Sequence, residues 1–282
     1  MKILVIGPSG QVGSTLLETL PAIGEVIAAG RRDLDLCKKE SIAKALAAAR
    51  PDVIVNAAAY TAVDQAETEE ALAMAVNRDG PALLAEEAAR RGALLVHFST
   101  DYVFDGEKPS PYVESDATNP LNAYGRSKLA GEQAIQRSGC RHLIFRTSWV
   151  YSHIGRNFLL TMRRLARDKR ELRVVDDQHG APTSSRMLAD AVPRAITAVL
   201  HDSSLGGLYH MSAQGSTTWC GFARAIVGDH VKVLPISSSE YPTPARRPRN
   251  SVLDNSKLEQ DFGIRLPSWQ SGLNDVLGAL AA

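Results

Sequence analysis

Short, unbroken runs of apolar residues alternate along the first half of the chain with longer stretches in which apolar residues recur every three or four positions. The unbroken runs predict buried strands at residues 2–6, 25–29, 53–56, 94–99 and 142–147. The periodic stretches predict helices at about 11–20, 40–49, 68–91 and 122–138. Such alternation is typical of an α/β fold in which helices cover both faces of a doubly wound parallel sheet.

Beyond residue 147 the pattern changes to long loops rich in glycine, proline, aspartate and arginine. Two further helices are predicted at about 156–169 and 185–200, and a strand at about 208–211. We interpret this part mainly as a smaller α/β lobe on the C-terminal side. The second helix and the strand are expected to return to the main sheet.

The first predicted strand runs into a glycine-rich turn with three-residue spacing between its glycines. A Cβ at these positions would block either the turn or the approach of a phosphate. The following helix would then direct its first N–H groups at a dinucleotide pyrophosphate. The alternative is a turn that binds nothing, but the strand before it and the helical spacing after it favour cofactor binding. The predicted contacts are Gly7, Gly10, Gln11, Val12 and Gly13.

This turn and the change of pattern after residue 147 together predict two functional units. A Rossmann-type, NAD(P)-binding domain is expected to comprise residues 1–150 together with about 184–212. A substrate-binding lobe is expected to comprise about 151–183 and 213–282.

Two arginines bear on which nicotinamide cofactor is used. Arg31 and Arg32 directly follow the second predicted strand, where an acidic residue would bind the ribose hydroxyls of NADH and repel a 2′-phosphate. Because neither Ala29 nor Gly30 is acidic, the guanidinium groups predict a preference for NADPH and leave the use of NADH open. The alternative is that both arginines point into solvent.

A tyrosine and a lysine four residues apart form the second informative motif. Tyr124 and Lys128 fall in the first turns of the helix after the fourth strand, where residues four apart share a face. A lysine ammonium beside a phenol would lower its pKa from about 10 and ready it for proton transfer. Thr100, at the end of the fourth strand, would bind the same substrate oxygen, and Asp101 could contact the substrate. The alternative is a surface tyrosine packed on a lysine stem.

The glycine turn, Thr100 and the Tyr-x-x-x-Lys motif together resemble the extended branch of the short-chain dehydrogenase/reductase superfamily. More specific segments resemble the dTDP-4-dehydrorhamnose reductase family. They lie at residues 56–64, 99–106, 146–151, 177–183 and 245–258. The resemblance therefore covers nearly the whole chain.

The resemblance implies reduction of the C4 ketone of dTDP-4-dehydro-6-deoxy-L-mannose to dTDP-L-rhamnose by NAD(P)H. Tyr124 is then the proton donor, and Thr100 and Lys128 complete the catalytic triad. Implied cofactor contacts, besides the glycine turn and the arginine pair, are Asp35, Leu36, Ala58, Ala59, Tyr60, Thr61, Asn77, Tyr124 and Lys128. Implied substrate contacts are Thr100, Asp101, Trp149, Asn157, Arg246 and Arg249.

Some substrate assignments have structural alternatives. Trp149 could belong to the core, as large aromatic residues after strands usually do. Arg246, Arg247 and Arg249 could form a solvated run of charge. Prolines interrupt that run and stiffen it, and a diphosphate fits a guanidinium fork, so we expect at least one of the three to bind it.

Related activities share this fold and triad. A dTDP-sugar 4,6-dehydratase is expected to carry an acid next to Asp101, where this chain has Tyr102. A nucleotide-sugar 4-epimerase would retain its nicotinamide and need no external reductant. A reductase of another 4-keto-6-deoxy sugar and a non-catalytic regulatory subunit are the remaining alternatives.

Composition excludes other classes of protein. The formal net charge is +1, from 32 basic and 31 acidic residues, and no basic stripe or long apolar stretch suggests nucleic-acid or membrane binding. Cys37, Cys140 and Cys220 are far apart and lack the spacing of a metal or redox motif, so we expect reduced cysteines of a cytoplasmic protein. The histidines form no metal-ligand pair in the sequence. We expect a monomer or homodimer. Metal-bridged dimers described for the family use carboxylates at two positions that here are Thr15 and Arg186, so we do not expect a metal-bridged dimer.

Overall fold

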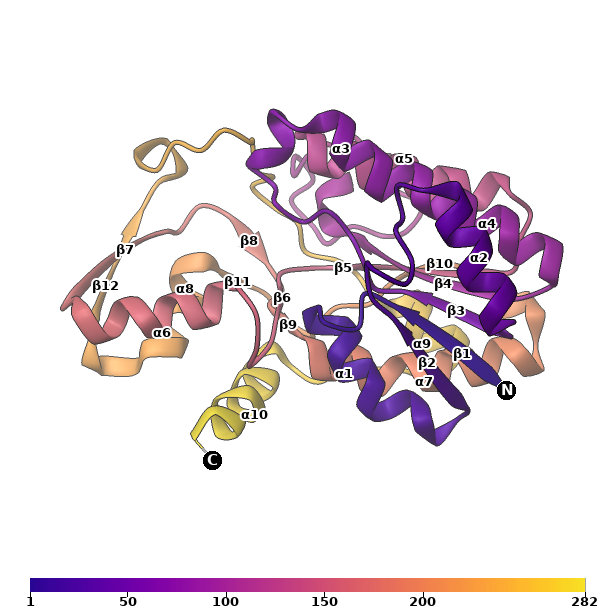
Figure 1. Ribbon diagram of the computed structural model, residues 1–282. Coiled ribbons are helices and arrows are strands. Elements are labelled where there is room, and N and C mark those ends of the chain that lie inside the picture. Colours follow the sequence, from indigo (N-terminus) through magenta and orange to yellow (C-terminus); the bar gives the residue numbers. More distant parts are fainter. Residues whose placement is uncertain (282) are drawn as a thin grey trace.

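A six-stranded parallel sheet forms the centre of the computed structural model, which describes residues 1–281 (Figure 1). Its strands, in the order β10-β5-β4-β3-β1-β2, include all those expected from the sequence. Their bounds are β1 Lys2–Ile6, β2 Glu25–Ala29, β3 Val53–Asn56, β4 Leu94–Thr100, β5 His142–Thr147 and β10 Gly207–His210. The order reverses between β1 and β3, and sheets of this class bind ligands beyond the carboxyl ends of the strands at such a reversal.

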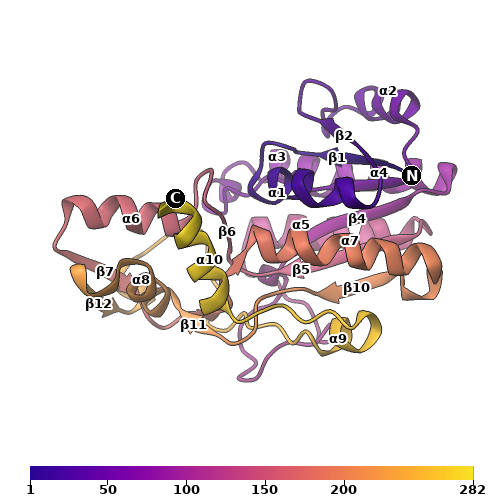
Figure 2. The ribbon, with the colours of Figure 1, turned by 90° about the horizontal axis from the view of Figure 1, so that it is seen from below.

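Helices cover both faces of the sheet, which confirms the doubly wound fold (Figures 1 and 2). The helices α1 (Gln11–Thr19) and α7 (Ser185–His201) lie on one face. On the other face lie α2 (Lys39–Ala49), α4 (Gly80–Arg91) and α5 (Ala123–Arg137). A short helix, α3 (Glu70–Met74), continues into α4 through one π-helical turn, Ala75–Asp79. The central strands β1, β3, β4 and β5 are buried on both sides, as their unbroken apolar runs predict, whereas the edge strand β2 is largely half-buried or exposed.

The smaller lobe is built around a parallel pair of strands, β7 (Glu171–Val175) and β12 (Lys232–Ile236). Two helices flank this pair, α6 (Phe158–Asp168) and α8 (Trp219–Val227). Short strand pairs connect the lobe to the sheet: β6 (Val150–Tyr151) with β9 (Thr183–Ser184), and β8 (His179–Gly180) with β11 (Thr217–Thr218). The chain ends with α9 (Ser256–Phe262) and α10 (Trp269–Ala281). Among residues 1–281, no helix has both the length and the apolar character needed to cross a membrane.

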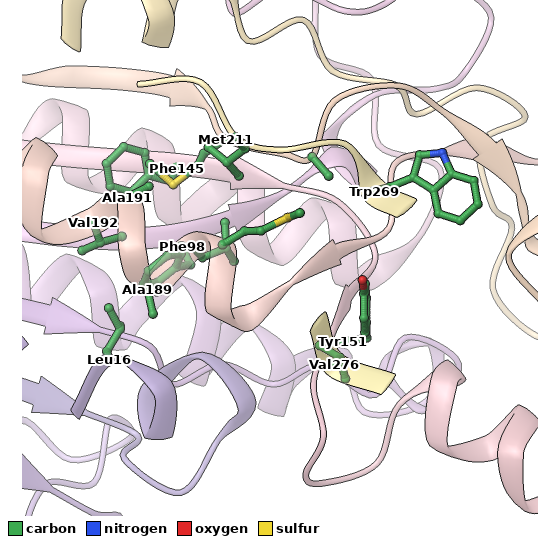
Figure 3. Packing of buried hydrophobic residues seen from close by; sticks show 14 of the residues in the cluster. Leu16, Phe98, Phe145, Tyr151, Ala189, Ala191, Val192, Met211, Trp269 and Val276 are labelled. Atoms are coloured by element: carbon green, nitrogen blue, oxygen red, sulfur yellow. The ribbon is translucent and has the colours of Figure 1, made fainter. Parts of the chain in front are cut away.

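One hydrophobic cluster extends through both parts of the molecule (Figure 3). It joins Leu16 of α1 and Phe145 of β5 to Tyr151, Trp269 and Val276 in the smaller lobe and the last helix. Because the two parts share a core, the smaller lobe is packed against the sheet rather than attached by a loose linker. We propose the functional division stated above, in which β10 and α7 belong to the cofactor-binding domain.

Candidate active site

The glycine turn after β1 packs tightly at two of its glycines and stays open at the third. Gly7 has a φ of 81°, and a Cβ there would lie 2.9 Å from Ala58. A Cβ on Gly13 would lie 2.1 Å from the carbonyl oxygen of Gly7. At Gly10, the N-cap of α1, a Cβ would meet only that same oxygen, at 3.4 Å. The open side of Gly10 and the uncapped first turn of α1 fit the pyrophosphate of a dinucleotide.

The arginine pair lies just beyond the end of β2, at the surface. Arg31 and Arg32 are exposed directly after β2, and neither forms an ion pair within residues 1–281. The sequence interpretation overlooked Asp33, whose carboxylate folds back to accept the N–H of Gly30 at 3.0 Å. The carboxylate of Asp33 therefore lies just beyond the end of β2, where its negative charge would oppose the binding of a 2′-phosphate.

Several of the implied cofactor residues use their side chains to build the loops of the site. Asn77 accepts the N–H of Tyr60 at 2.8 Å and donates to the Tyr60 carbonyl at 2.9 Å and to Ser127 at 2.9 Å. It therefore fixes the loop after β3 against α5. Asp35 accepts a backbone N–H in its own turn, and Leu36 is buried. Any contact of Asn77 or Leu36 with a cofactor would thus be indirect or through the backbone.

Tyr124 and Thr100 meet at the carboxyl edge of the sheet. Thr100 ends β4, and Tyr124 lies in the first turn of α5, whose N-cap Asn122 accepts the N–H of Gly125 at 2.8 Å. Burial raises the pKa of Tyr124 to about 12, although a hydrogen bond with Thr100 acts in the opposite direction. The expectation of a lowered pKa is therefore wrong, because burial outweighs the hydrogen bond with Thr100 and the charge of Asp101 also raises the pKa. Tyr124 is a protonated phenol at neutral pH.

Lys128 lies one turn further along α5 and is buried. Its Nζ donates to the carbonyl oxygen of Phe98 at 2.6 Å and lies 3.1 Å from Nε2 of His97. Burial lowers the pKa of Lys128 to about 8, and the carboxylate of Glu132 opposes that shift. The sequence interpretation did not include His97, and the only signal was its place in β4, three residues before Thr100.

Asp101 is a buried carboxylate that is surrounded by hydroxyl groups. Thr100 donates to it at 3.1 Å and Ser148 at 2.9 Å, and Ser251 of the C-terminal tail also binds it. Burial raises its pKa to about 6, while these hydroxyl groups restrain the rise. This carboxylate can accept a hydrogen bond from a sugar hydroxyl.

Trp149 and Asn157 lie on the side of the site that faces the smaller lobe. Trp149 has a φ of 48°, which is rare for a residue other than glycine. Its ring stacks on Trp219, with centroids 3.5 Å apart and planes 5° apart. Asn157 caps α6 and donates to Oε1 of Gln11 at 2.8 Å. The structure thus gives Asn157 a role in holding the lobe to the glycine turn, which its assignment as a substrate contact did not anticipate.

The three tail arginines have different surroundings. Arg246 is exposed, and its carbonyl accepts a hydrogen bond from Asn122 at 2.8 Å. Arg249 lines a cavity of about 730 Å³ between the tail, the loop at 106–111 and the loop at 176–179. Arg247, which lies between them, donates to both oxygens of Asp64, at 2.6 and 2.7 Å. The sequence gave no signal for this ion pair, because its members lie far apart along the chain.

These features define a class of protein: an oxidoreductase of the extended short-chain dehydrogenase/reductase type. A glycine turn lies at the point where the strand order reverses, and Thr100, Tyr124 and Lys128 gather beside it. The family follows from comparison with known proteins. The family model described as "RmlD substrate binding domain" matches residues 1–282, and the chain belongs to this family.

The chain is similar to several proteins named dTDP-4-dehydrorhamnose reductase. That of Burkholderia thailandensis is 48% identical in an alignment of 285 positions that covers 96% of this chain and 96% of that protein. That of Escherichia coli K12 is 44% identical in an alignment of 293 positions that covers 99% of this chain and 98% of that protein.

Solved structures of this enzyme are also similar over their full length. The structure from Clostridium acetobutylicum has a TM-score of 0.94 and 39% identity and covers 100% of both chains. The structure from Bacillus anthracis, in complex with NADP, has a TM-score of 0.92 and 36% identity, with 99% of each chain covered.

Proposed function

We propose that this protein is an NADPH-dependent reductase that converts dTDP-4-dehydro-6-deoxy-L-mannose into dTDP-L-rhamnose. The observation that carries the proposal is the meeting of Thr100, Tyr124 and Lys128 beside the glycine turn, in a chain 48% identical to a protein named for this activity. The turn has the open glycine and uncapped helix that a dinucleotide needs. Arg31 and Arg32 favour the phosphorylated form of the cofactor.

In this mechanism the nicotinamide cofactor, when bound, supplies the hydride that reduces C4. The hydroxyl groups of Thr100 and Tyr124 donate hydrogen bonds to the C4 oxygen. The bond from Tyr124 strengthens as negative charge develops on that oxygen. Since the pKa of Tyr124 lies near 12, the phenol is protonated throughout the neutral range and can give its proton to the more basic alkoxide. Asp101 orients the sugar by accepting a hydroxyl hydrogen.

The surroundings of Tyr102 favour reduction over 4,6-dehydration. Tyr102 stands where a dehydratase is expected to carry an acid, and its ring packs edge-on against Tyr124 with centroids 6.2 Å apart. Burial raises its pKa above the usual value and outweighs the hydrogen bond from Arg247, which acts in the opposite direction. A phenol held in this way is a poor acid for expelling a C6 hydroxyl group.

The test is to offer the purified protein dTDP-4-dehydro-6-deoxy-L-mannose and NADPH and to identify the product by NMR. We expect NADPH oxidation and dTDP-L-rhamnose. Rapid turnover of a sugar with a different configuration and slow turnover of this one would assign the reductase to another 4-keto-6-deoxy sugar. Binding of both ligands without oxidation would instead indicate a non-catalytic subunit.

Location and assembly complete the proposal. We propose a cytoplasmic enzyme that works as a monomer or homodimer. Local contacts argue against a metal-bridged dimer. Thr15 is buried and its hydroxyl lies 2.9 Å from that of Ser185, and Arg186 forms ion pairs with Glu18 and Asp190 of its own chain. These contacts do not resemble a carboxylate site for a bridging metal. Sedimentation velocity with and without chelator would measure the assembly state.

A further inference from the structure

Three buried polar side chains form a chain of contacts from the loop after β3 to Lys128. Asn56 at the end of β3, His97 in β4 and Lys128 in α5 are each no more than 2% exposed. Nδ2 of Asn56 lies 3.1 Å from Nδ1 of His97, and Nε2 of His97 lies 3.1 Å from Nζ of Lys128. Nothing described above requires a histidine at this place.

Backbone groups at the two ends of this chain fix the direction of its hydrogen bonds. The N–H of Ala58 can only donate, and it lies 3.2 Å from Oδ1 of Asn56. The amide oxygen of Asn56 therefore faces Ala58, and its NH₂ group donates to Nδ1 of His97. Burial lowers the pKa of His97 well below its usual value, so the ring is neutral and carries a single proton. That proton must be on Nε2, where it points at Lys128.

At the other end, the carbonyl oxygen of Phe98 can only accept, and Nζ of Lys128 donates to it at 2.6 Å. A neutral amine satisfies both neighbours, because one N–H donates to Phe98 and the lone pair accepts from Nε2 of His97. An ammonium group has three N–H donors and no acceptor, so it would turn a donor towards the N–H of His97.

We propose that Asn56 and His97 form a hydrogen-bond relay that presents an N–H to Lys128 and favours the neutral amine of this lysine in the cofactor-free protein. The relay cannot conduct protons to solvent, because it ends at an amide and a backbone N–H. It is a positioning device that sets the charge beside Tyr124. It begins at Ala58, so it also connects that charge to a loop that we propose contacts the cofactor.

The other groups around Lys128 are consistent with this assignment. Burial acts in the same direction as the relay. Glu132, on the same helix, favours the ammonium, but its carboxylate is engaged by Arg146 of β5 at 2.7 Å and by Ser99 of β4. Tyr124, one turn earlier, is a neutral phenol, and Asp101 lies beyond Thr100 at the end of β4.

The inference rests on the proposed function only for the role of Lys128, because the charge of the lysine can be measured without turnover. The measurement is an NMR pH titration of the cofactor-free protein with ¹³C at the lysine Cε positions, and the Lys128 signal is the one missing in Lys128→Met. We expect Lys128 to titrate well below the exposed lysines. Titration together with them would overturn the proposal.

Two substitutions of Asn56 separate the relay from burial. In Asn56→Asp, one carboxylate oxygen still accepts from Ala58 while the other accepts from Nδ1–H of His97. Nε2 then becomes an acceptor, and the pKa of Lys128 should rise by about one unit or more. Asn56→Ala adds no charge, but it removes the donor to Nδ1 and lets the ring proton of His97 move from Nε2 to Nδ1. A smaller rise in the pKa of Lys128 is therefore expected. An unchanged titration in Asn56→Ala would contradict the relay.

A matched control distinguishes the relay from the added charge. In the double variant Asn56→Asp/His97→Phe the carboxylate remains but the imidazole is gone. The rise in the pKa of Lys128 that Asn56→Asp causes should therefore be much smaller in the His97→Phe background than in the wild-type background. An equal rise in both backgrounds would mean that the charge acts through space, and the relay would be rejected. NADPH oxidation by the wild-type protein, measured separately, tests the proposed function.

Discussion

At the level of single residues, the proposed chemistry depends on one hydroxyl group. Tyr124→Phe retains the ring that packs against Tyr102 and removes the proton donor. We expect kcat to fall by about 10²–10⁴ while the Kd for NADPH changes little. Steady-state kinetics and fluorescence titration measure the two quantities, with the exposed Tyr241→Phe as a matched control. Turnover near the wild-type rate would remove Tyr124 from the mechanism.

The buried carboxylate of Asp101 should produce an acid limb in the pH profile. The ionised form is needed to accept from the sugar, and the pKa is raised to about 6. Activity, measured as kcat/KM, should therefore fall as the pH drops through about 6. In Asp101→Asn the value should be lower throughout, and this limb should be absent. Persistence of the limb in the variant would assign it to another group.

Cofactor preference depends on the charges after β2. Replacing Arg31 and Arg32 by serine removes two exposed guanidinium groups, each worth about 1.5 kcal/mol or less at an exposed site. NADPH binding should weaken about tenfold, while NADH binding should hardly change. Asp33→Asn is the opposing control, because it removes the nearby negative charge and should increase the preference for NADPH. The ratio of kcat/KM for the two cofactors, at fixed ionic strength, measures both effects.

At the level of elements, sequence periodicity predicted the regular part of the fold. The central strands of the main sheet are buried on both faces and the helices between them are amphipathic, so their patterns are unambiguous. The strands of the smaller lobe were missed. In β7 charged residues alternate with apolar ones, and β12 contains Pro235, so neither resembles a buried parallel strand.

The same contrast applies to the candidate site. Contacts that depend on residues close in sequence, such as the glycine turn and the Tyr-x-x-x-Lys pair, could be predicted because helix geometry alone brings them together. The pairs Asn56–His97 and Asp64–Arg247 join distant segments, and only the folded chain brings them into contact. Raised pKa values were likewise unpredictable, because burial depends on the whole structure.

The ion pair between Asp64 and Arg247 fixes the C-terminal tail to the loop after β3. The hydrogen bond that Asp64 accepts from Arg247 is the main cause of the lowered pKa of Asp64. Because Asp64 is half-exposed, we expect Arg247→Met to cost only about 1 kcal/mol, or about 2–4 °C in Tm. Asp64→Asn should cost a similar amount, and the double variant little more than either. Calorimetry measures all three, and strict additivity would show that the pair is not coupled.

This stabilisation should depend on pH with a definite sign. A carboxyl whose folded pKa is lowered stabilises the protein above its unfolded pKa and loses that effect as the pH falls through its folded value. The difference in Tm between wild type and Asp64→Asn should therefore begin to shrink as the pH falls below about 4, and it should disappear only below the lowered folded pKa of Asp64.

At the level of the whole molecule, the last helix completes the shared core. Trp269, Leu273 and Val276 of α10 are each no more than 7% exposed. A chain that ends at residue 268 should lose cooperative thermal unfolding and expose apolar surface that binds a hydrophobic dye. A chain that ends at residue 278 retains all three side chains and should unfold like the full-length protein. A cooperative transition in the shorter chain would show that α10 is dispensable for folding.

The position of β10 next to β5 also determines when the protein can fold during its synthesis. The first five strands are complete once residue 147 has been made, but β5 remains an open edge until Gly207–His210 emerges from the ribosome. At about 5–20 residues per second, that edge stays unpaired for several seconds. The nascent chain therefore presents an apolar strand edge during that interval, and its yield in the cell should depend on chaperones that bind such segments.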